Sequence, residues 1–134
     1  MKLHILILLL FINCFNKVNS AQEDISSLIE MSLNSCNDAK QYYHFEIKNR
    51  RNISIIFKKI NNPLTRKIKC FGILINENND LNKNGNLIEV LDYKTSSNNF
   101  FLLYKIVNQG AVVETNMEYI NGEWKFSNCN IVEI

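Results

Sequence analysis

The stretch from Asp80 to Leu91 places oxygen-bearing side chains at alternate positions ahead of a glycine, as the loop of a calcium-binding EF-hand does. Loop positions one, three and five are Asp80, Asn82 and Asn84, and position six is Gly85. Position twelve should be a glutamate that closes the site with both carboxylate oxygens, but it is Leu91. Because calcium needs several charged oxygens, we interpret this segment as an Asx-rich turn and not as a metal site.

His44 is the histidine that remains once the N-terminal leader described below is set aside. A histidine acts as a general base when a carboxylate orients it, and Asp38 and Glu46 are close to it in the sequence. One alternative function is therefore a pocket enzyme that uses His44 with a carboxylate. A single histidine between Tyr43 and Phe45 is more often structural, so we assign no catalytic residue and no cofactor.

Three cysteines follow the leader, namely Cys36, Cys70 and Cys129. In an oxidising compartment two of them are expected to form a disulfide, and the odd thiol could stay buried or join two chains as a homodimer. The apolar periodicity turns both Cys36 and Cys70 toward the core, which favours that pair and leaves Cys129 as the free or alternative cysteine. No Cys-x-x-Cys pair or cysteine–histidine cluster indicates zinc, so no metal site is predicted.

Residues 1–20 have the pattern of a signal peptide. A basic start at Lys2 leads into the apolar run Ile5–Phe15, which is shorter than the roughly 20 residues that a membrane anchor needs. We therefore expect a secreted, extracellular protein in which residues 21–134 form a single domain without a membrane segment. In that compartment, the sequon that starts at Asn52 predicts an N-linked glycan.

Charge is unevenly distributed along the chain. Segment 40–69 holds nine lysines and arginines and one acid, Glu46, whereas residues 70–134 hold four lysines and eight acids. A polyanion binder that uses the basic segment is therefore a second alternative function. Without the leader the basic and acidic residues balance, which argues against nucleic acid as a partner and favours basic and acidic strands that neighbour each other. The basic residues considered are Lys58, Lys59, Arg66, Lys67 and Lys69.

One helix and a sheet must position the candidate residues named above. Apolar residues recur at three- and four-residue steps over 23–39, which predicts an amphipathic helix. Asn121-Gly122 is the pattern of a two-residue hairpin turn between two strands. The predicted strands are 53–60, 66–75, 100–107, 111–120 and 123–134, with one short helix around 86–91. We predict an α+β fold, with an N-terminal amphipathic helix packed on a curved antiparallel sheet of four to six strands.

Gly122, Trp124, Lys125 and Phe126 form a Gly-x-Trp-Lys-aromatic pattern near the end of the chain. With the aromatic-rich strand and the long strand before it, this ending resembles the last three strands of the nuclear-transport-factor-two-like family. The resemblance covers mainly the last 35 residues. It implies a cone-shaped α+β domain with a leading helix, and in enzymes of the family the pocket often holds an aspartate or a histidine.

Large aromatic side chains could line an apolar pocket between the helix and the sheet, or they could fill the core. The residues assigned to such a pocket are His44, Tyr43, Tyr104, Tyr119 and Trp124. The function predicted is that of a secreted, non-enzymatic domain. It would bind a small apolar ligand or act as an extracellular interaction module with an unknown partner.

Overall fold

The computed structural model describes residues 24–77 and 84–134. The predicted signal peptide lies outside these ranges, as do Asp80 and Asn82 of the EF-hand-like loop. Signal-peptide cleavage and the first positions of the loop therefore stay predictions.

Helix α2 spans Ile25–Ser35 and begins at Asp24, whose carboxylate accepts a hydrogen bond from the Ser26 backbone N–H at 3.3 Å. The α-helix ends earlier than predicted, because Cys36 has an extended backbone. The chain continues as the 3₁₀ helix η1, Asn37–Tyr43. The residues around this break are small and polar, and such side chains compete for backbone hydrogen bonds and weaken a helix end.

The sheet has seven strands in the order β2-β3-β1-β4-β5-β6-β7. Their bounds are Ile53–Phe57 for β1, Lys69–Cys70 for β2, Ile73–Asn76 for β3, Asn86–Thr95 for β4, Asn99–Ile106 for β5, Ala111–Ile120 for β6 and Glu123–Glu133 for β7. Strand β1 is parallel to both of its neighbours, β3 and β4, and the other pairs are antiparallel. The α+β class is confirmed, but the antiparallel sheet of four to six strands was wrong.

Two local predictions were wrong in ways that account for the extra strands. Phe71 and Gly72 have positive φ angles of 47° and 81°, so they form a turn that divides the predicted strand 66–75 into β2 and β3. The helix predicted around 86–91 is instead the start of β4. There Ile88 and Val90 alternate with less buried residues, which is the period of a strand.

The predicted hairpin at Asn121-Gly122 is confirmed. Strands β6 and β7 pair up to Ile120 and Glu123, and the two turn residues have φ angles of 53° and 84°. Positive φ at both positions is what a type I′ turn requires, and asparagine and glycine tolerate it best.

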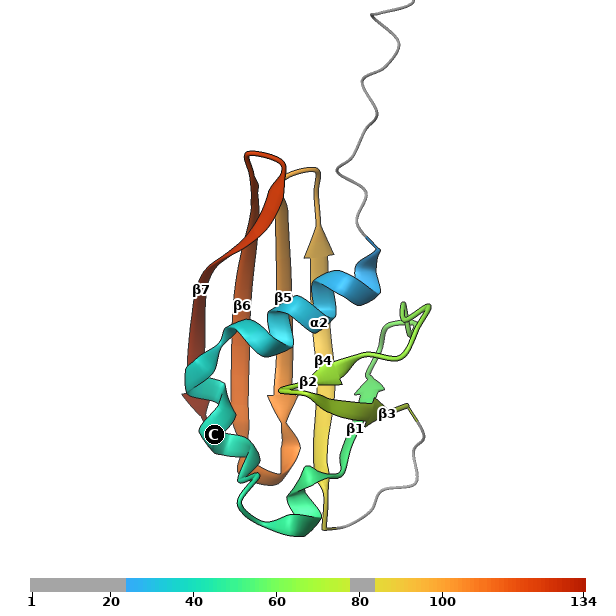
Figure 1. The fold of residues 1–134 in the computed structure, drawn as a ribbon, viewed down its shortest axis with the longest axis vertical. Helices are drawn as coiled ribbons and strands as arrows, with labels where there is room; N and C mark the ends of the chain where they lie inside the picture. The colour runs from blue at the N-terminus through green and yellow to red at the C-terminus, as the bar shows by residue number, and fades with distance from the viewer. Residues whose placement is uncertain (1–23, 78–83) are drawn as a thin grey trace, which may run out of the picture.

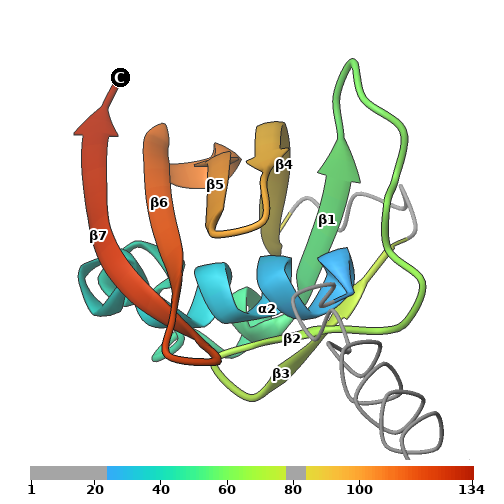
Figure 2. The ribbon, with the colours of Figure 1, turned by 90° about the horizontal axis from the view of Figure 1, so that it is seen from above.

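The core lies between α2 and the concave face of the sheet (Figures 1 and 2). Figure 2 shows β4 to β7 curving around one side of α2, while β2 and β3 pass on its other side. Leu28, Ile29 and Leu33 are buried on the helix, and the inward residues of β5, which include Phe100 and Leu102, are buried opposite them. The opposite face of the sheet carries no helix in the described part of the chain.

The disulfide joins Cys36 to Cys129, with Cα atoms 5.9 Å apart, and not Cys36 to Cys70 as predicted. The helix residue that faces β2 is Asn34, whose side chain bonds to the backbone of Phe71. Cys36 is two residues further on and therefore lies on another side of the chain, toward β7. Cys70 is buried and free. A disulfide is compatible with an extracellular protein.

Candidate functional site

The five residues predicted to line an apolar pocket lie in three places. Tyr43 and Tyr104 are completely buried in the core. Tyr119 and Trp124 pack together, with ring centroids 5.3 Å apart, beside the β6–β7 turn. His44 is part of the surface hollow described below. Because two of the five have no accessible surface, a ligand could reach them only after a rearrangement, and binding of an apolar ligand stays a prediction.

Tyr43 and Tyr104 form a buried polar group with Cys70. Burial raises the pKa of the Cys70 thiol to about 12, and it also raises the pKa of both tyrosines. The Tyr43 hydroxyl lies close enough to Cys70 and to Tyr104 for side-chain hydrogen bonding to act on these pKa values, so the three groups are neighbours. Nevertheless, neither hydroxyl has a hydrogen-bond partner of good geometry among the described residues. A buried hydroxyl without a partner is costly, so this is an unusual arrangement for a core.

His44 ends η1 in the left-handed region, with a φ angle of 49°. Its Nδ1 lies 2.9 Å from Oε1 of Glu46. The Tyr42 hydroxyl donates to Oε1 of Glu133 at 2.7 Å and so connects η1 to the end of β7. An open hollow of about 330 Å³ is lined by Gln41, Tyr42, His44, Gln109 and Glu133.

The histidine–carboxylate pair has the geometry of a weak general base. The Glu46 backbone N–H lowers the pKa of the Glu46 carboxyl, and the hydrogen bond with His44 lowers it further. Both side chains are largely exposed, with 41% of the His44 side chain and 70% of the Glu46 side chain accessible. Water therefore screens the pair, which limits its catalytic power.

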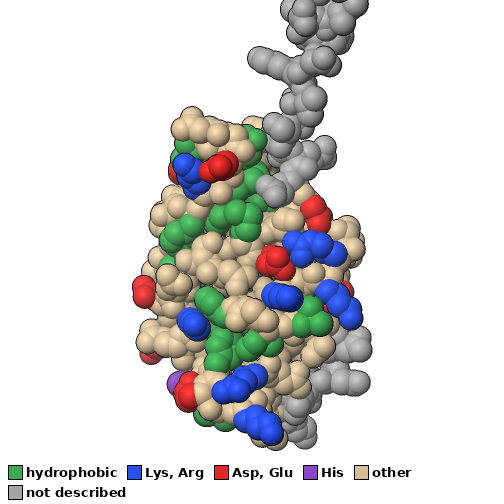
Figure 3. Space-filling model, viewed as in Figure 1, with side chains coloured by type: hydrophobic (Ala, Val, Ile, Leu, Met, Phe, Trp, Pro, Cys, Tyr) green, Lys and Arg blue, Asp and Glu red, His purple; other side chains and the backbone are tan. Residues whose placement is uncertain are grey.

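The basic segment is partly neutralised by acids from other elements. Arg66 lies 3.3 Å from Glu30 and 4.0 Å from Asp24, and Lys58 lies 3.4 Å from Glu89. Figure 3 shows basic and acidic side chains interspersed on the face that carries α2. Of the five basic side chains considered for polyanion binding, Lys58 and Arg66 therefore form ion pairs within the protein.

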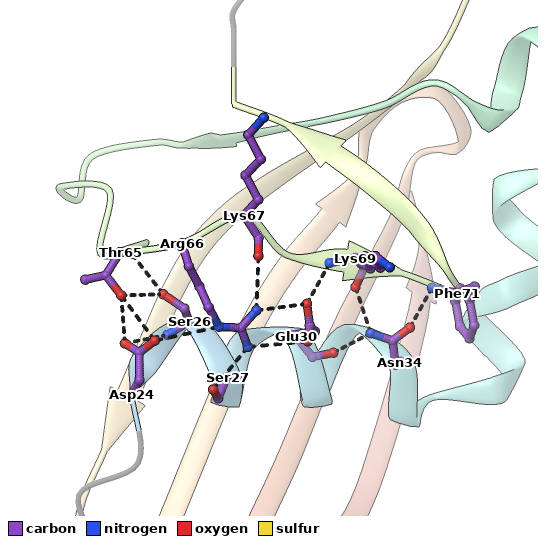
Figure 4. A network of polar contacts seen from close by, with 10 residues as sticks. All are labelled: Asp24, Ser26, Ser27, Glu30, Asn34, Thr65, Arg66, Lys67, Lys69 and Phe71. Carbon is purple, nitrogen blue, oxygen red and sulfur yellow. Dashed lines mark hydrogen bonds and ion pairs between the residues drawn. The ribbon is translucent and has the colours of Figure 1, made fainter.

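At one edge of the sheet, α2 covers the backbone of the segment 65–71 (Figure 4). The Ser26 hydroxyl accepts from Thr65 N at 2.9 Å, and the Glu30 carboxylate accepts from Lys69 N at 2.7 Å. Asn34 Nδ2 donates to Lys69 O at 2.9 Å, and its Oδ1 accepts from Phe71 N. Ser26, Glu30 and Asn34 are four residues apart, so they share one face of the helix. Their side chains take the place of a neighbouring strand.

The other edge of the sheet, β7, has no such cover among the described residues. It has eleven residues, and it pairs with β6 on one side only. Ile134 N donates to Gly110 O at 2.9 Å, so these two residues form a hydrogen-bonded pair. Hydrogen-bonded and non-hydrogen-bonded pairs alternate along an antiparallel ladder. The backbone N–H and C=O groups of Ile131 and Glu133 therefore point away from β6. Three large apolar side chains near this edge are exposed, namely Phe126 at 42%, Val132 at 51% and Ile134 at 76%.

Sequence reasoning did not identify this edge as a candidate site. The alternation of "NCNIVEI" indicates a strand, but it cannot show that the strand has one neighbour and not two.

The part of the EF-hand-like loop that the structure describes has a structural role. A Cβ atom added to Gly85 would lie 2.6 Å from the backbone oxygen of Asn52, so only glycine fits there. The next residue, Asn86, donates its side-chain N–H groups to the backbone oxygens of Tyr43 and Arg50. The glycine is therefore explained by close packing between η2, Lys48–Arg51, and the start of β4.

Asn52, the predicted glycosylation site, is half-buried immediately before β1. Its side-chain oxygen accepts from the Asn76 amide at 3.1 Å, and Ser54 of the sequon is buried in the strand. The glycan stays a prediction, and it would have to leave the protein at the contact between β1 and β3.

Within the described residues, no three His, Cys, Asp or Glu side chains are grouped closely enough to hold a metal ion. The helices in this part of the chain are also too short or too polar to cross a membrane. Comparisons of the chain with protein-family models, with curated proteins and with solved structures found no match.

Proposed function

We propose that this protein is a secreted, non-enzymatic interaction module that binds an extended strand of another extracellular protein along β7. The observation that carries the proposal is the combination of an eleven-residue edge strand with the exposed apolar side chains of Phe126, Val132 and Ile134. An added strand would bond to the outward backbone groups of β7 and cover Val132 and Ile134, which share one face of the strand, while Phe126 lies on the other face. Such a partner gains affinity from the backbone and specificity from the side chains.

Secretion belongs to this proposal. It is supported by the leader-like sequence of residues 1–20 and by the Cys36–Cys129 disulfide. Mass spectrometry of the non-reduced protein from the culture medium of expressing cells is the test. We expect a chain that begins near Ala21, carries this one disulfide and has a glycan at Asn52. A full-length chain that stays inside the cell with reduced cysteines would exclude an extracellular role.

Binding along β7 is tested with a library of random extended peptides, displayed and selected against the folded protein. The substitution Val132→Lys should lower the binding affinity of the selected peptides by about tenfold or more, because it puts a charge where the added strand packs. Ile47→Lys is the matched control, because Ile47 and Val132 are both 51% exposed and Ile47 lies between η1 and η2, outside the strands of the sheet. If both substitutions had the same effect, or neither had any, β7 would not be the binding edge.

A second candidate function is supported by the His44–Glu46 pair beside its hollow. It would be a hydrolytic enzyme with His44 as the general base. Turnover of a panel of chromogenic esters by the wild type and by His44→Gln is the test. Turnover that falls at least about a hundredfold in the variant would favour the enzyme. Equal background rates would leave the interaction module as the better proposal.

A further inference from the structure

The segment 65–76, called the flap from here on, is attached to the sheet by few backbone contacts. It contains β2 and β3, and β3 pairs with β1 through only Ile75 and Asn76. By contrast, β5 and β6 pair over eight residues. The flap also contains the positive-φ turn at Phe71 and Gly72. A segment with so few pairings is expected to open before the rest of the sheet unfolds.

The flap is held by polar contacts to α2 at the surface and by the burial of Ile68, Cys70 and Ile75 in the core. Glu30 and Asn34 form hydrogen bonds with the backbone at Lys69 and Phe71. Arg66 of the flap forms an ion pair with Glu30. Figure 4 shows these contacts side by side along one face of the helix. Each of these polar contacts can be exchanged for a hydrogen bond to water when the flap opens, so they add only modestly to the apolar burial that opposes opening.

The inner side of the flap carries Cys70, which is completely buried. Its neighbours are the hydroxyls of Tyr43 and Tyr104, and neither hydroxyl has a hydrogen-bond partner of good geometry in the described chain. Opening the flap would allow water to satisfy both hydroxyls. The closed flap therefore hides one thiol and two unsatisfied hydroxyls together, and opening relieves part of the cost of their burial.

We propose that the flap opens locally while the rest of the domain stays folded, and that Cys70 makes this opening a redox-sensitive switch. In the closed state the thiol is inaccessible. In the open state it loses its proton to solvent, and the thiolate attacks one sulfur of a small-molecule disulfide. A bond forms between Cys70 and that sulfur, the original sulfur–sulfur bond breaks, and the other half leaves as a thiolate with the electron pair.

The mixed disulfide then holds the flap open. The position of Cys70 is 0% exposed and packed against Tyr43 and Tyr104, so it has no room for an additional group. A reducing thiol reverses the reaction and allows the flap to close. The resident Cys36–Cys129 disulfide is not consumed in this exchange.

The test is the rate at which a chromogenic aromatic disulfide labels the folded protein at increasing urea concentrations. If the flap opens locally, labelling at low urea is faster than global unfolding permits, and it depends on urea less steeply than global unfolding does because only the surface of the flap is exposed. If labelling follows the global unfolding equilibrium at every urea concentration, the proposal is overturned. A Cys70→Ser variant shows how much of the signal comes from any other thiol.

Paired variants sharpen this test. Glu30→Gln combined with Asn34→Ala weakens the polar contacts at Lys69 and Phe71 and should raise the low-urea labelling rate by about tenfold or more. Met117→Ala is the control, because Met117 is buried in β6 and its truncation lowers global stability without touching the flap. It should leave the low-urea rate unchanged. If the control raised this rate as much as the double variant did, labelling would report global unfolding.

Hydrogen exchange of the labelled protein provides the last readout. Amides of the flap should lose protection, whereas those of β4 to β7 should keep it. Loss of protection throughout the labelled protein would mean that modification of Cys70 unfolds the domain, and the switch would be refuted.

Discussion

The two edges of the sheet differ in the length of their strands and in what covers them. At β2 the strand has only two residues, and helix side chains bond to the backbone around it. At β7 the strand has eleven residues, and it exposes backbone groups and apolar side chains together. An uncovered edge strand is a site for pairing with another chain. Within residues 24–77 and 84–134, one edge is therefore covered by helix side chains and the other is not.

The same helix is connected to both edges, but by different chemistry. Glu30 and Asn34 bind the flap next to β2 through hydrogen bonds, whereas Cys36 binds β7 through the disulfide to Cys129. The hydrogen bonds can open and reform quickly, and the disulfide persists until it is reduced. The β7 edge is therefore attached to the helix end by a covalent bond, whereas the β2 edge is attached to the helix by hydrogen bonds.

Removing the covalent connection should have the largest effect. The substitutions Cys36→Ser and Cys129→Ser together open a link between residues 93 apart in the sequence. The chain-entropy estimate for a loop of this length is about 4–5 kcal/mol of lost stability. Urea denaturation of the double variant and of the reduced wild type should give similar, strongly lowered midpoints. An unchanged midpoint would show that the disulfide is not important for stability.

Removing part of the polar connection should have a smaller effect. Asn34→Ala leaves Lys69 O and Phe71 N without their helix partners, and we expect a loss of about 1–2 kcal/mol in unfolding free energy. Ser35→Ala is the matched control, since the Ser35 hydroxyl bonds only to Met31 O within the helix. If the two variants were equally stable, the contact between Asn34 and the flap would contribute nothing.

The polar connection should also respond to acid. Burial raises the pKa of the Glu30 carboxyl, but the hydrogen bonds and charges of Arg66 and Lys69 outweigh it and hold the pKa below 4.5. Asp24 and Ser27 also contact Arg66 at this site. Because the folded pKa is depressed, this contribution to stability is fully present above pH 4.5, and it is lost as the pH falls through the lower folded value.

Glu30→Gln should therefore flatten the fall in stability below about pH 4.5, measured as the urea midpoint against pH. Glu118→Gln, an exposed change on β6, is the control and should keep the fall of the wild type. An acid response in Glu30→Gln identical to that of the wild type would contradict the role of Glu30.

The smallest effect on stability is expected at the open edge. Val132→Lys should change the unfolding free energy by no more than about 0.5 kcal/mol, because the side chain is exposed. It should nevertheless slow aggregation of the concentrated protein, measured by light scattering, because a lysine on an edge strand opposes strand pairing. Ile47→Lys should leave the aggregation rate as it is, and equal slowing by both would point to net charge as the cause.

Much of the fold could be predicted because it depends on local patterns. The apolar spacing in α2, the short apolar run in β5 and the Asn121-Gly122 turn each reflect the geometry of a few neighbouring residues. The candidate sites were harder to predict. Tyr43 and His44 are adjacent in sequence, yet one is completely buried and the other lines a surface hollow. Their separation arises where η1 ends in the left-handed conformation at His44.

The amino-acid sequence by itself determined that the chain forms one amphipathic helix followed by strands, because periodicity acts over a few residues and needs no knowledge of partners. Only the tertiary structure decided that β1 is inserted between β3 and β4, that Cys36 binds Cys129, and that β7 is the last strand in the order of the sheet. Such outcomes depend on contacts between residues far apart in the chain. They are decided by which surfaces pack together, and no local pattern carries that information.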